Sequence, residues 1–193
     1  MAVGCWVLAF SCWPLAFCFW LSSLTANSQQ PIANPQQPIA NPQQPIANSQ
    51  TYHLRKEHDS LYWLNDWRLP YPVYRFETGD VDGDGREDAM VGVVKATRYY
   101  PEQGRRLFIF KAVDNSRQPG GQKRVRPLWL GSKLGGRLED FRYVGEGHIR
   151  SLETTDEGLY VVADYRWGGF GMTFDHYLIK GTNQTTALKL FNQ

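Results

Sequence analysis

Residues 74–96 read YRFETGDVDGDGREDAMVGVVKA, and they are the most informative stretch for the fold. Two runs rich in β-branched and aromatic residues, 74–78 and 89–96, flank a segment of aspartate and glycine. Such runs are typical of strands, and aspartate–glycine pairs are typical of turns. We therefore predict two antiparallel strands joined by an acidic loop.

The same pattern continues along the chain, where turn signals such as Gly120-Gly121 and Gly168-Gly169 separate further strand-like runs. These runs are residues 106–113, 124–130, 141–144, 149–154, 159–165 and 173–180. They predict an all-β antiparallel meander of about eight strands. A complete propeller needs at least about four four-stranded blades, so the domain is either a small β-domain or a partial β-propeller. A short helix fits only the stretch before Pro70.

The chain before Arg55 contains no aspartate, glutamate, lysine or arginine. A folded surface in water carries charges, so we place these residues outside the globular domain. Residues 6–24, WVLAFSCWPLAFCFWLSSL, are apolar and precede a small-residue step at Ala26. We predict a signal peptide over residues 1–26, with a retained N-terminal anchor as the alternative. The domain is then secreted or periplasmic, or membrane-anchored by its N-terminal segment.

Residues 27–51 contain a seven-residue unit three times, as QQPIANP, QQPIANP and QQPIANS. Their prolines exclude a continuous helix and favour extended polyproline II, so we predict a disordered Pro/Gln-rich linker. The folded domain is then residues 52–193. All three cysteines, Cys5, Cys12 and Cys18, lie in the leader, so this domain has no disulfide and no cysteine metal site.

The acidic loop has the pattern of a metal site. Carboxylates at alternating positions can point at one centre, while glycines let the chain curl around it. Hard oxygen ligands in a flexible loop are those that Ca²⁺ prefers. A turn without metal is the alternative. The candidate ligands are the carboxylates of Asp80, Asp82, Asp84 and Asp88, the last directly or through water, and the backbone carbonyl of Arg86.

The segment from Phe76 through Ala89 resembles the calcium loop of FG-GAP/VCBS-type repeats, which occur in integrin-α-like β-propellers and many exported bacterial proteins. The match is confined mainly to residues 76–96. The resemblance implies that the four aspartates bind Ca²⁺ between two strands of a blade. A weaker echo occurs at residues 138–149, where the sequence Gly145-Glu146-Gly147 replaces the aspartates, so this unit is not expected to bind metal.

Two further surfaces are candidates for binding. A basic stretch could face an anionic ligand, and an aromatic hairpin could form a sugar platform; a solvated strand face and packing on glycine turns are the alternatives. The basic candidates are Arg105, Arg106, Lys123, Arg124 and Arg126, and the aromatic ones are Trp167 and Phe170.

The net charge of +2 excludes a strongly basic nucleic-acid binder. We find no catalytic set, so an enzyme is the less favoured class. The sequence indicates an exported calcium-binding β-module with a binding or envelope-organising role. Its partner would be a glycan, an anionic envelope surface or another exported protein, and it would touch a membrane only through an uncleaved leader. The alternatives are a secreted enzyme or accessory domain of unknown chemistry, and a purely structural domain.

Overall fold

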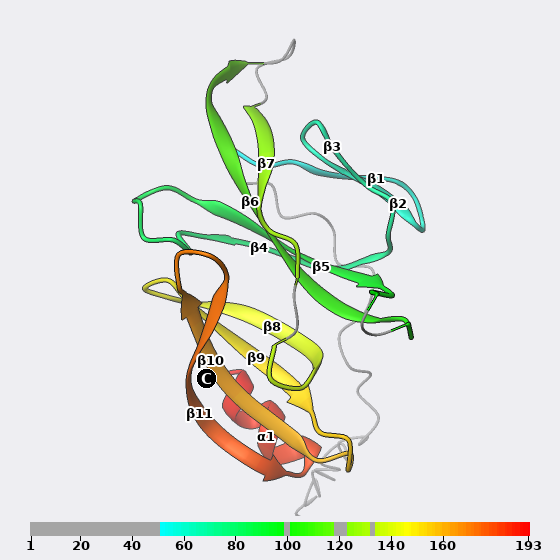
Figure 1. Cartoon of the computed structure of the whole chain (residues 1–193), viewed down its shortest axis with the longest axis vertical. Coiled ribbons are helices and arrows are strands. Elements are labelled where there is room, and N and C mark those ends of the chain that lie inside the picture. Colours follow the sequence, from blue (N-terminus) through cyan, green and yellow to red (C-terminus); the bar gives the residue numbers. More distant parts are fainter. Residues whose placement is uncertain (1–50, 99–100, 118–122, 132–133) are drawn as a thin grey trace, which may run out of the picture. The chain divides into compact units, whose positions relative to one another are not determined.

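The computed structural model describes residues 51–98, 101–117, 123–131 and 134–193. The predicted signal peptide and almost all of the predicted linker lie outside these residues. The described residues form three open antiparallel sheets and one helix (Figure 1). Strands that follow one another along the chain are neighbours within each sheet, so each sheet is a meander. The predicted all-β antiparallel class is confirmed.

The first sheet contains β1 (Leu54–His58), β2 (Leu61–Leu64) and β3 (Trp67–Leu69). The second sheet contains β4 (Val73–Gly79), β5 (Asp88–Lys95), β6 (Gly104–Arg117) and β7 (Lys123–Trp129). The third sheet contains β8 (Arg137–Gly145), β9 (His148–Thr154), β10 (Tyr160–Trp167) and β11 (Met172–Thr182). The helix α1 (Gln184–Phe191) follows. Each of the eight predicted strands corresponds to one strand from β4 to β11.

The main core lies between the second and third sheets. Met90 and Ile109 from the second sheet pack with Phe141 and Ile149 from the third, and all four are fully buried. Val81, in the acidic loop, also belongs to this core. The loop is therefore attached to the shared core of two sheets.

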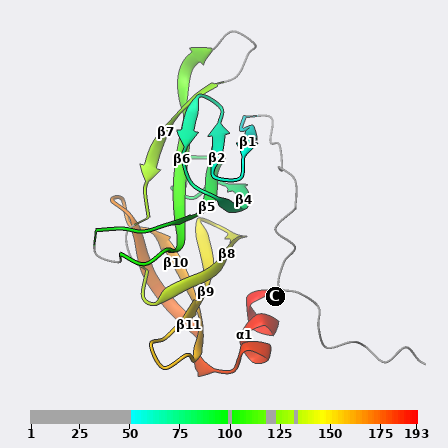
Figure 2. The ribbon, with the colours of Figure 1, turned by 90° about the vertical axis from the view of Figure 1, so that its right-hand side faces the viewer.

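The opposite faces of both large sheets are also covered. Leu64 and Leu69 of the first sheet pack with Val91 of the second sheet. Ala187 and Phe191 of α1 pack against the third sheet, and Figure 2 shows the helix beside it. Because alternate residues of β5 face two different layers, its sequence reads as a continuous apolar run rather than as an alternation.

The stretch before Pro70 forms strands β1 to β3, so the helix considered there is wrong. Asn65 adopts a left-handed conformation with φ 52° between β2 and β3. Its side chain accepts a hydrogen bond from the His53 N–H (2.7 Å) and donates to the carbonyls of Thr51 (3.0 Å) and Lys123 (2.7 Å). These bonds hold a tight turn where a helix would have to continue.

The helix lies instead near the C-terminus, where Asn183 caps it by accepting a hydrogen bond from the Thr186 N–H (2.9 Å). Within the described part of the chain, no helix is long and apolar enough to cross a membrane.

Candidate metal centre

The first carboxylate of the acidic loop organises the chain around itself. The loop, residues 80–87, joins β4 to β5. The Asp80 carboxylate accepts hydrogen bonds from the N–H groups of Gly83 (2.8 Å), Asp84 (3.1 Å) and Gly85 (2.8 Å). Gly83 and Gly85 have φ of 75° and 81°, which side chains other than glycine rarely adopt. The two glycines therefore allow the loop to curl around Asp80.

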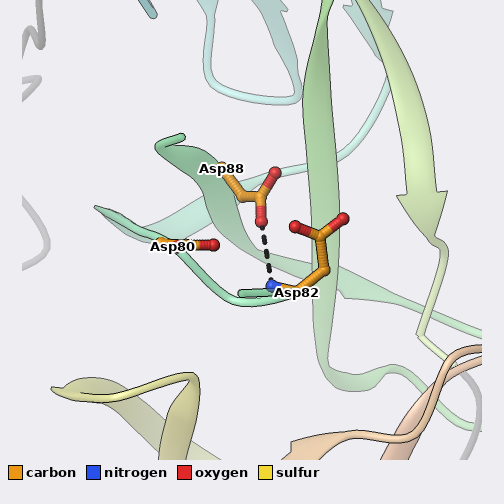
Figure 3. Close-up of side chains that lie close together, drawn as sticks. All are labelled: Asp80, Asp82 and Asp88. Carbon is orange, nitrogen blue, oxygen red and sulfur yellow. Dashed lines mark hydrogen bonds between the residues drawn. The ribbon is translucent and has the colours of Figure 1, made fainter. Parts of the chain in front are cut away.

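Asp88 closes the loop from the start of β5 and is fully buried. Its Oδ2 accepts hydrogen bonds from the N–H groups of Val81 (3.1 Å) and Asp82 (3.4 Å), the second of which is drawn in Figure 3. Its Oδ1 is buried without a partner among the described residues. Burial raises the pKa of Asp88 to about 6, and the neighbouring charge of Asp82 acts in the same direction.

Three carboxylates converge in this loop. One oxygen from each of Asp80, Asp82 and Asp88 lies within 4.8 Å of the others (Figure 3). Oδ1 of Asp82, like Oδ1 of Asp88, is buried and has no hydrogen-bond partner in the described chain. A buried acceptor without a partner costs free energy, and like charges at this spacing repel. A bound cation would remove both costs, so the donor set fits a hard metal ion.

Lys111 also reaches into the loop. It lies on β6 directly opposite Asp88 in the β5–β6 register. Its ammonium donates to Oδ2 of Asp82 and lies 2.6 Å from Oδ2 of Asp84. Burial alone would lower the pKa of Lys111, but its hydrogen bonds to the two carboxylates raise it overall. The same hydrogen bond lowers the pKa of Asp84.

The structure thus brings three of the five predicted metal residues together directly. Asp84 lies beside them with its carboxylate on Lys111. The Arg86 N–H donates to Oδ1 of Asp84 (3.1 Å), which keeps the predicted fifth residue within the turn. Sequence reasoning missed Lys111, which lies far from the aspartates in the sequence. Its place in the site comes from strand register, which no pattern near the aspartates encodes.

A neighbouring turn in the third sheet supports the loop. The Tyr143 hydroxyl donates to the Asp80 carbonyl (3.0 Å) and accepts from the Gly147 N–H (3.4 Å). The Tyr143 ring lies against Gly79, where a Cβ would be 2.4 Å from a ring carbon. Gly79 therefore has to be a glycine for Tyr143 to reach the loop.

The other end of the loop is held by Tyr52, which is fully buried. Its hydroxyl donates to the Glu87 carbonyl (2.7 Å) and accepts from the Ala112 N–H (2.9 Å). Tyr52 thus connects the base of the loop to β6, next to Lys111.

A cleft of about 530 Å³ opens beside the loop. It brings Trp167 of the predicted aromatic platform to the same place as Asp80 and Asp82. Phe170, the other platform residue, is 97% exposed and is not among the residues that line the cleft. The remaining polar side chains of the lining are Tyr143, Glu146, His148, Arg166 and Asp175.

The predicted basic residues lie in different surroundings. Arg105 donates to the Glu139 carbonyl and lies 3.7 Å from its carboxylate. Arg106 follows it on the strand, and its guanidinium donates to the Arg105 carbonyl (2.8 Å). Arg124 pairs with Asp66 (3.2 Å). The exposed basic residues on β7 are Lys123, Arg124 and Arg126. These three therefore follow one another along β7, whereas Arg105 and Arg106 lie on β6.

A larger cleft, of about 1290 Å³, is lined by residues of the second and third sheets. Its charged groups include the Arg105–Glu139 pair and the Arg137–Asp156 pair (3.7 Å). Glu153 is buried and accepts a hydrogen bond from the Ser151 hydroxyl (2.7 Å). The described residues of the lining include no histidine and no cysteine.

A scan of this sequence against models of protein families finds no match, and neither do searches of curated proteins and of solved structures. The likeness to FG-GAP/VCBS-type repeats thus depends on the loop residues themselves.

Proposed function

We propose that this protein binds one Ca²⁺ ion in the loop between β4 and β5. One observation carries the proposal: two buried carboxylate oxygens, Oδ1 of Asp82 and Oδ1 of Asp88, have no partner in the described chain although they belong to a three-carboxylate cluster. Buried polar atoms are nearly always satisfied in proteins, so an unsatisfied pair in one cluster indicates a missing ligand. Two acceptor oxygens call for a cation.

The ion would be held by the Asp80, Asp82 and Asp88 carboxylates, with Asp84 and the Arg86 carbonyl completing the set. Ca²⁺ takes about six to eight oxygen ligands in flexible geometry, whereas Mg²⁺ is smaller and keeps several waters. A loop rich in glycine and carboxylates fits the larger ion better. The resemblance to FG-GAP/VCBS-type loops supports the same choice. The ion would supply positive charge that fixes the loop, rather than reaction chemistry.

We also propose that the domain is a small β-domain and not a segment of a propeller. Propeller blades cover one another's faces. Here the outer faces of the second and third sheets are covered by the first sheet and by α1. With the predicted signal peptide and linker, this supports an exported, non-catalytic module that the linker holds away from a membrane or wall.

Isothermal titration calorimetry on the chelator-treated protein tests the metal. We expect Ca²⁺ to bind with a Kd of about 10⁻⁴ to 10⁻³ M, the range of extracellular modules, and more tightly than Mg²⁺. Asp88→Asn keeps the size of the side chain and should abolish binding. Asp156→Asn, at an 89% exposed turn position, is the matched control and should bind as the parent does. Equal binding by both variants would place the metal elsewhere.

The cleft beside the loop supports a second candidate function, glycan binding. An aromatic ring next to several polar side chains is a common arrangement for sugars, because the ring packs against C–H groups while polar atoms bind hydroxyls. Trp167 provides the ring here. On a glycan array, Trp167→Ala should lose binding whereas Phe170→Ala should retain it. The reverse result would move the platform to the exposed hairpin tip.

A further inference from the structure

Lys111 provides a cation of its own inside the acidic loop. Its ammonium contacts the carboxylates of Asp82 and Asp84, and its side chain is only 12% exposed. Both aspartates belong to the proposed calcium ligands. The contact is determined by strand pairing, since Lys111 lies opposite Asp88 in the sheet.

The ammonium satisfies only part of the loop. It is bound to Oδ2 of Asp82 and Oδ2 of Asp84, whereas Oδ1 of Asp82 and Oδ1 of Asp88 stay without partners. A lysine carries a single charge and three N–H donors, and here they are directed to one side of the cluster. The fully buried Asp88 accepts hydrogen bonds only from backbone N–H groups of the described residues, and its interaction with the ammonium is a through-space attraction.

We infer that Lys111 is a built-in competitor of the metal, so that Ca²⁺ binds by displacing its ammonium from Asp82 and Asp84. This inference rests on the proposed calcium site. A carboxylate oxygen that already accepts a hydrogen bond from an ammonium is a weaker metal ligand, and a Ca²⁺ ion held by Asp82 repels the ammonium beside it. The loop then has two states, one closed by Lys111 and one filled by the metal.

The exchange also selects for the charge of the ion. A monovalent cation brings no more charge than the ammonium that it would replace. Strand pairing already holds Lys111 beside the aspartates, whereas a free ion has to be taken from solution, so a monovalent ion would not displace the lysine. A divalent ion brings twice the charge and can reach the two oxygens that the lysine leaves unsatisfied. Lys111 thus determines which class of ion the loop accepts and lowers the affinity for all of them.

The first test is calorimetry on Lys111→Met, which removes the charge and keeps an unbranched side chain that is shorter by one atom. We expect Ca²⁺ to bind at least tenfold more tightly than to the parent, with Lys111→Arg as the charge-retaining control close to the parent. In chelator, Lys111→Met should melt at a lower temperature than the parent, because the acidic loop has lost its cation. Equal or weaker Ca²⁺ binding by Lys111→Met, beside a parent that binds, would overturn the inference and leave the calcium site standing. Absence of Ca²⁺ binding in both proteins would instead overturn the proposed function.

A second measurement uses the unmutated protein and does not depend on a variant that folds. Amine labelling followed by mass spectrometry compares the reactivity of Lys111 in Ca²⁺ and in chelator. Displacement predicts that Ca²⁺ increases the labelling of Lys111, because the ammonium leaves two carboxylates. Lys56, half-exposed and paired with Asp59 (2.7 Å) in the first sheet, is the internal control and should not change. Unchanged or reduced labelling of Lys111 at Ca²⁺ concentrations that saturate calorimetric binding would show that the lysine stays in place.

Discussion

The second and third sheets begin with the same kind of hairpin but close it differently. In the third sheet Gly145 pairs with His148, and only Glu146 and Gly147 lie between them. In the second sheet Gly79 pairs with Asp88, and the whole loop of residues 80–87 lies between. Two residues are therefore enough to join such strands. The additional residues of the acidic loop are not needed to reverse the chain. This supports the proposal that they form a metal site.

The two turns are also neighbours. Tyr143 joins them through its hydroxyl, and a Cβ on Gly147 would lie 3.2 Å from the Val81 carbonyl. The turn of Glu146 and Gly147 between β8 and β9, which we call the plain turn, thus supports the acidic loop. Five predictions test this division of roles, in order of decreasing effect.

The largest effect is expected from Phe141→Ala, because the ring is fully buried in the core that both sheets share. We expect the free energy of unfolding to fall by about 3–5 kcal/mol, measured by urea denaturation in chelator. Val144→Ala, on the same strand but 36% exposed, should change it by less than about 0.5 kcal/mol. A small loss for Phe141→Ala would mean that each sheet has its own core and that neither turn depends on the other.

The next effect concerns pH. The pKa of Asp88 is raised from 3.8 to about 6 when the chain folds, so ionising this group opposes folding. Its contribution to metal-free stability is greatest below about pH 4 and is lost as the pH rises to about 6, by at most about 3 kcal/mol. The free energy of unfolding of the parent minus that of Asp88→Asn should show this decrease when both are measured by denaturation from pH 4 to 8 in chelator. A flat difference would mean that Asp88 is not charged unfavourably in the folded loop.

Asp175, which lies beside the plain turn, should give a pH dependence of stability opposite to that of Asp88. Hydrogen bonding to His176, and nearby positive charge, lower its pKa below 3.8. Its contribution to stability is therefore present above about pH 4 and lost as the pH falls through the lowered value. Asp175→Asn should thus lose stability near neutral pH, where Asp88→Asn gains it.

Tyr143→Phe should have a smaller effect, because it removes only the hydroxyl between the two turns. We expect a loss of about 1 kcal/mol in the free energy of unfolding and a smaller Ca²⁺-dependent rise in melting temperature. Tyr177→Phe is the control, since the structure gives that hydroxyl no hydrogen bond to a described residue. If both variants respond to Ca²⁺ as the parent does, the plain turn does not support the loop.

Glu146→Gly should produce the smallest change, and in the stabilising direction. Glu146 has φ 50°, a left-handed conformation that glycine adopts more readily. The gain should be about 0.5 kcal/mol, because glycine also gives the unfolded chain more freedom. Thermal melts should show a slightly higher Tm with the Ca²⁺ response unchanged. A lower Tm would indicate that the Glu146 side chain has a role in the neighbouring cleft.

Local patterns in the sequence predicted the strands of the two large sheets well. The runs around Met90 and Ile109 are apolar because both faces of these strands are covered, and turn residues separate them from their neighbours. The acidic loop could be predicted for the same reason, because all of its candidate ligands lie within nine positions, from Asp80 to Asp88.

The features that the sequence did not predict depend on contacts between residues that are far apart along the chain. Strands β1 to β3 are short, and the bond from Asn65 to the Lys123 carbonyl joins them to a strand far along the chain. The helix α1 is short as well, and its burial against β9 and β10 could not be read from its own residues. Lys111 enters the site only through the β5–β6 register. None of these contacts produces a local pattern.

Tyr52 gives the loop a mechanical property. It stands at the very start of the described chain, and its hydroxyl joins the Glu87 carbonyl at the end of the loop to the Ala112 N–H on β6. The Thr51 carbonyl and the Tyr52 hydroxyl thus hold this end of the described chain, the first to the turn between β2 and β3 and the second to the end of the acidic loop. Through Tyr52, a force on this end would also act on the strand end that carries Asp88, so we expect the affinity of the proposed calcium site to depend on that force.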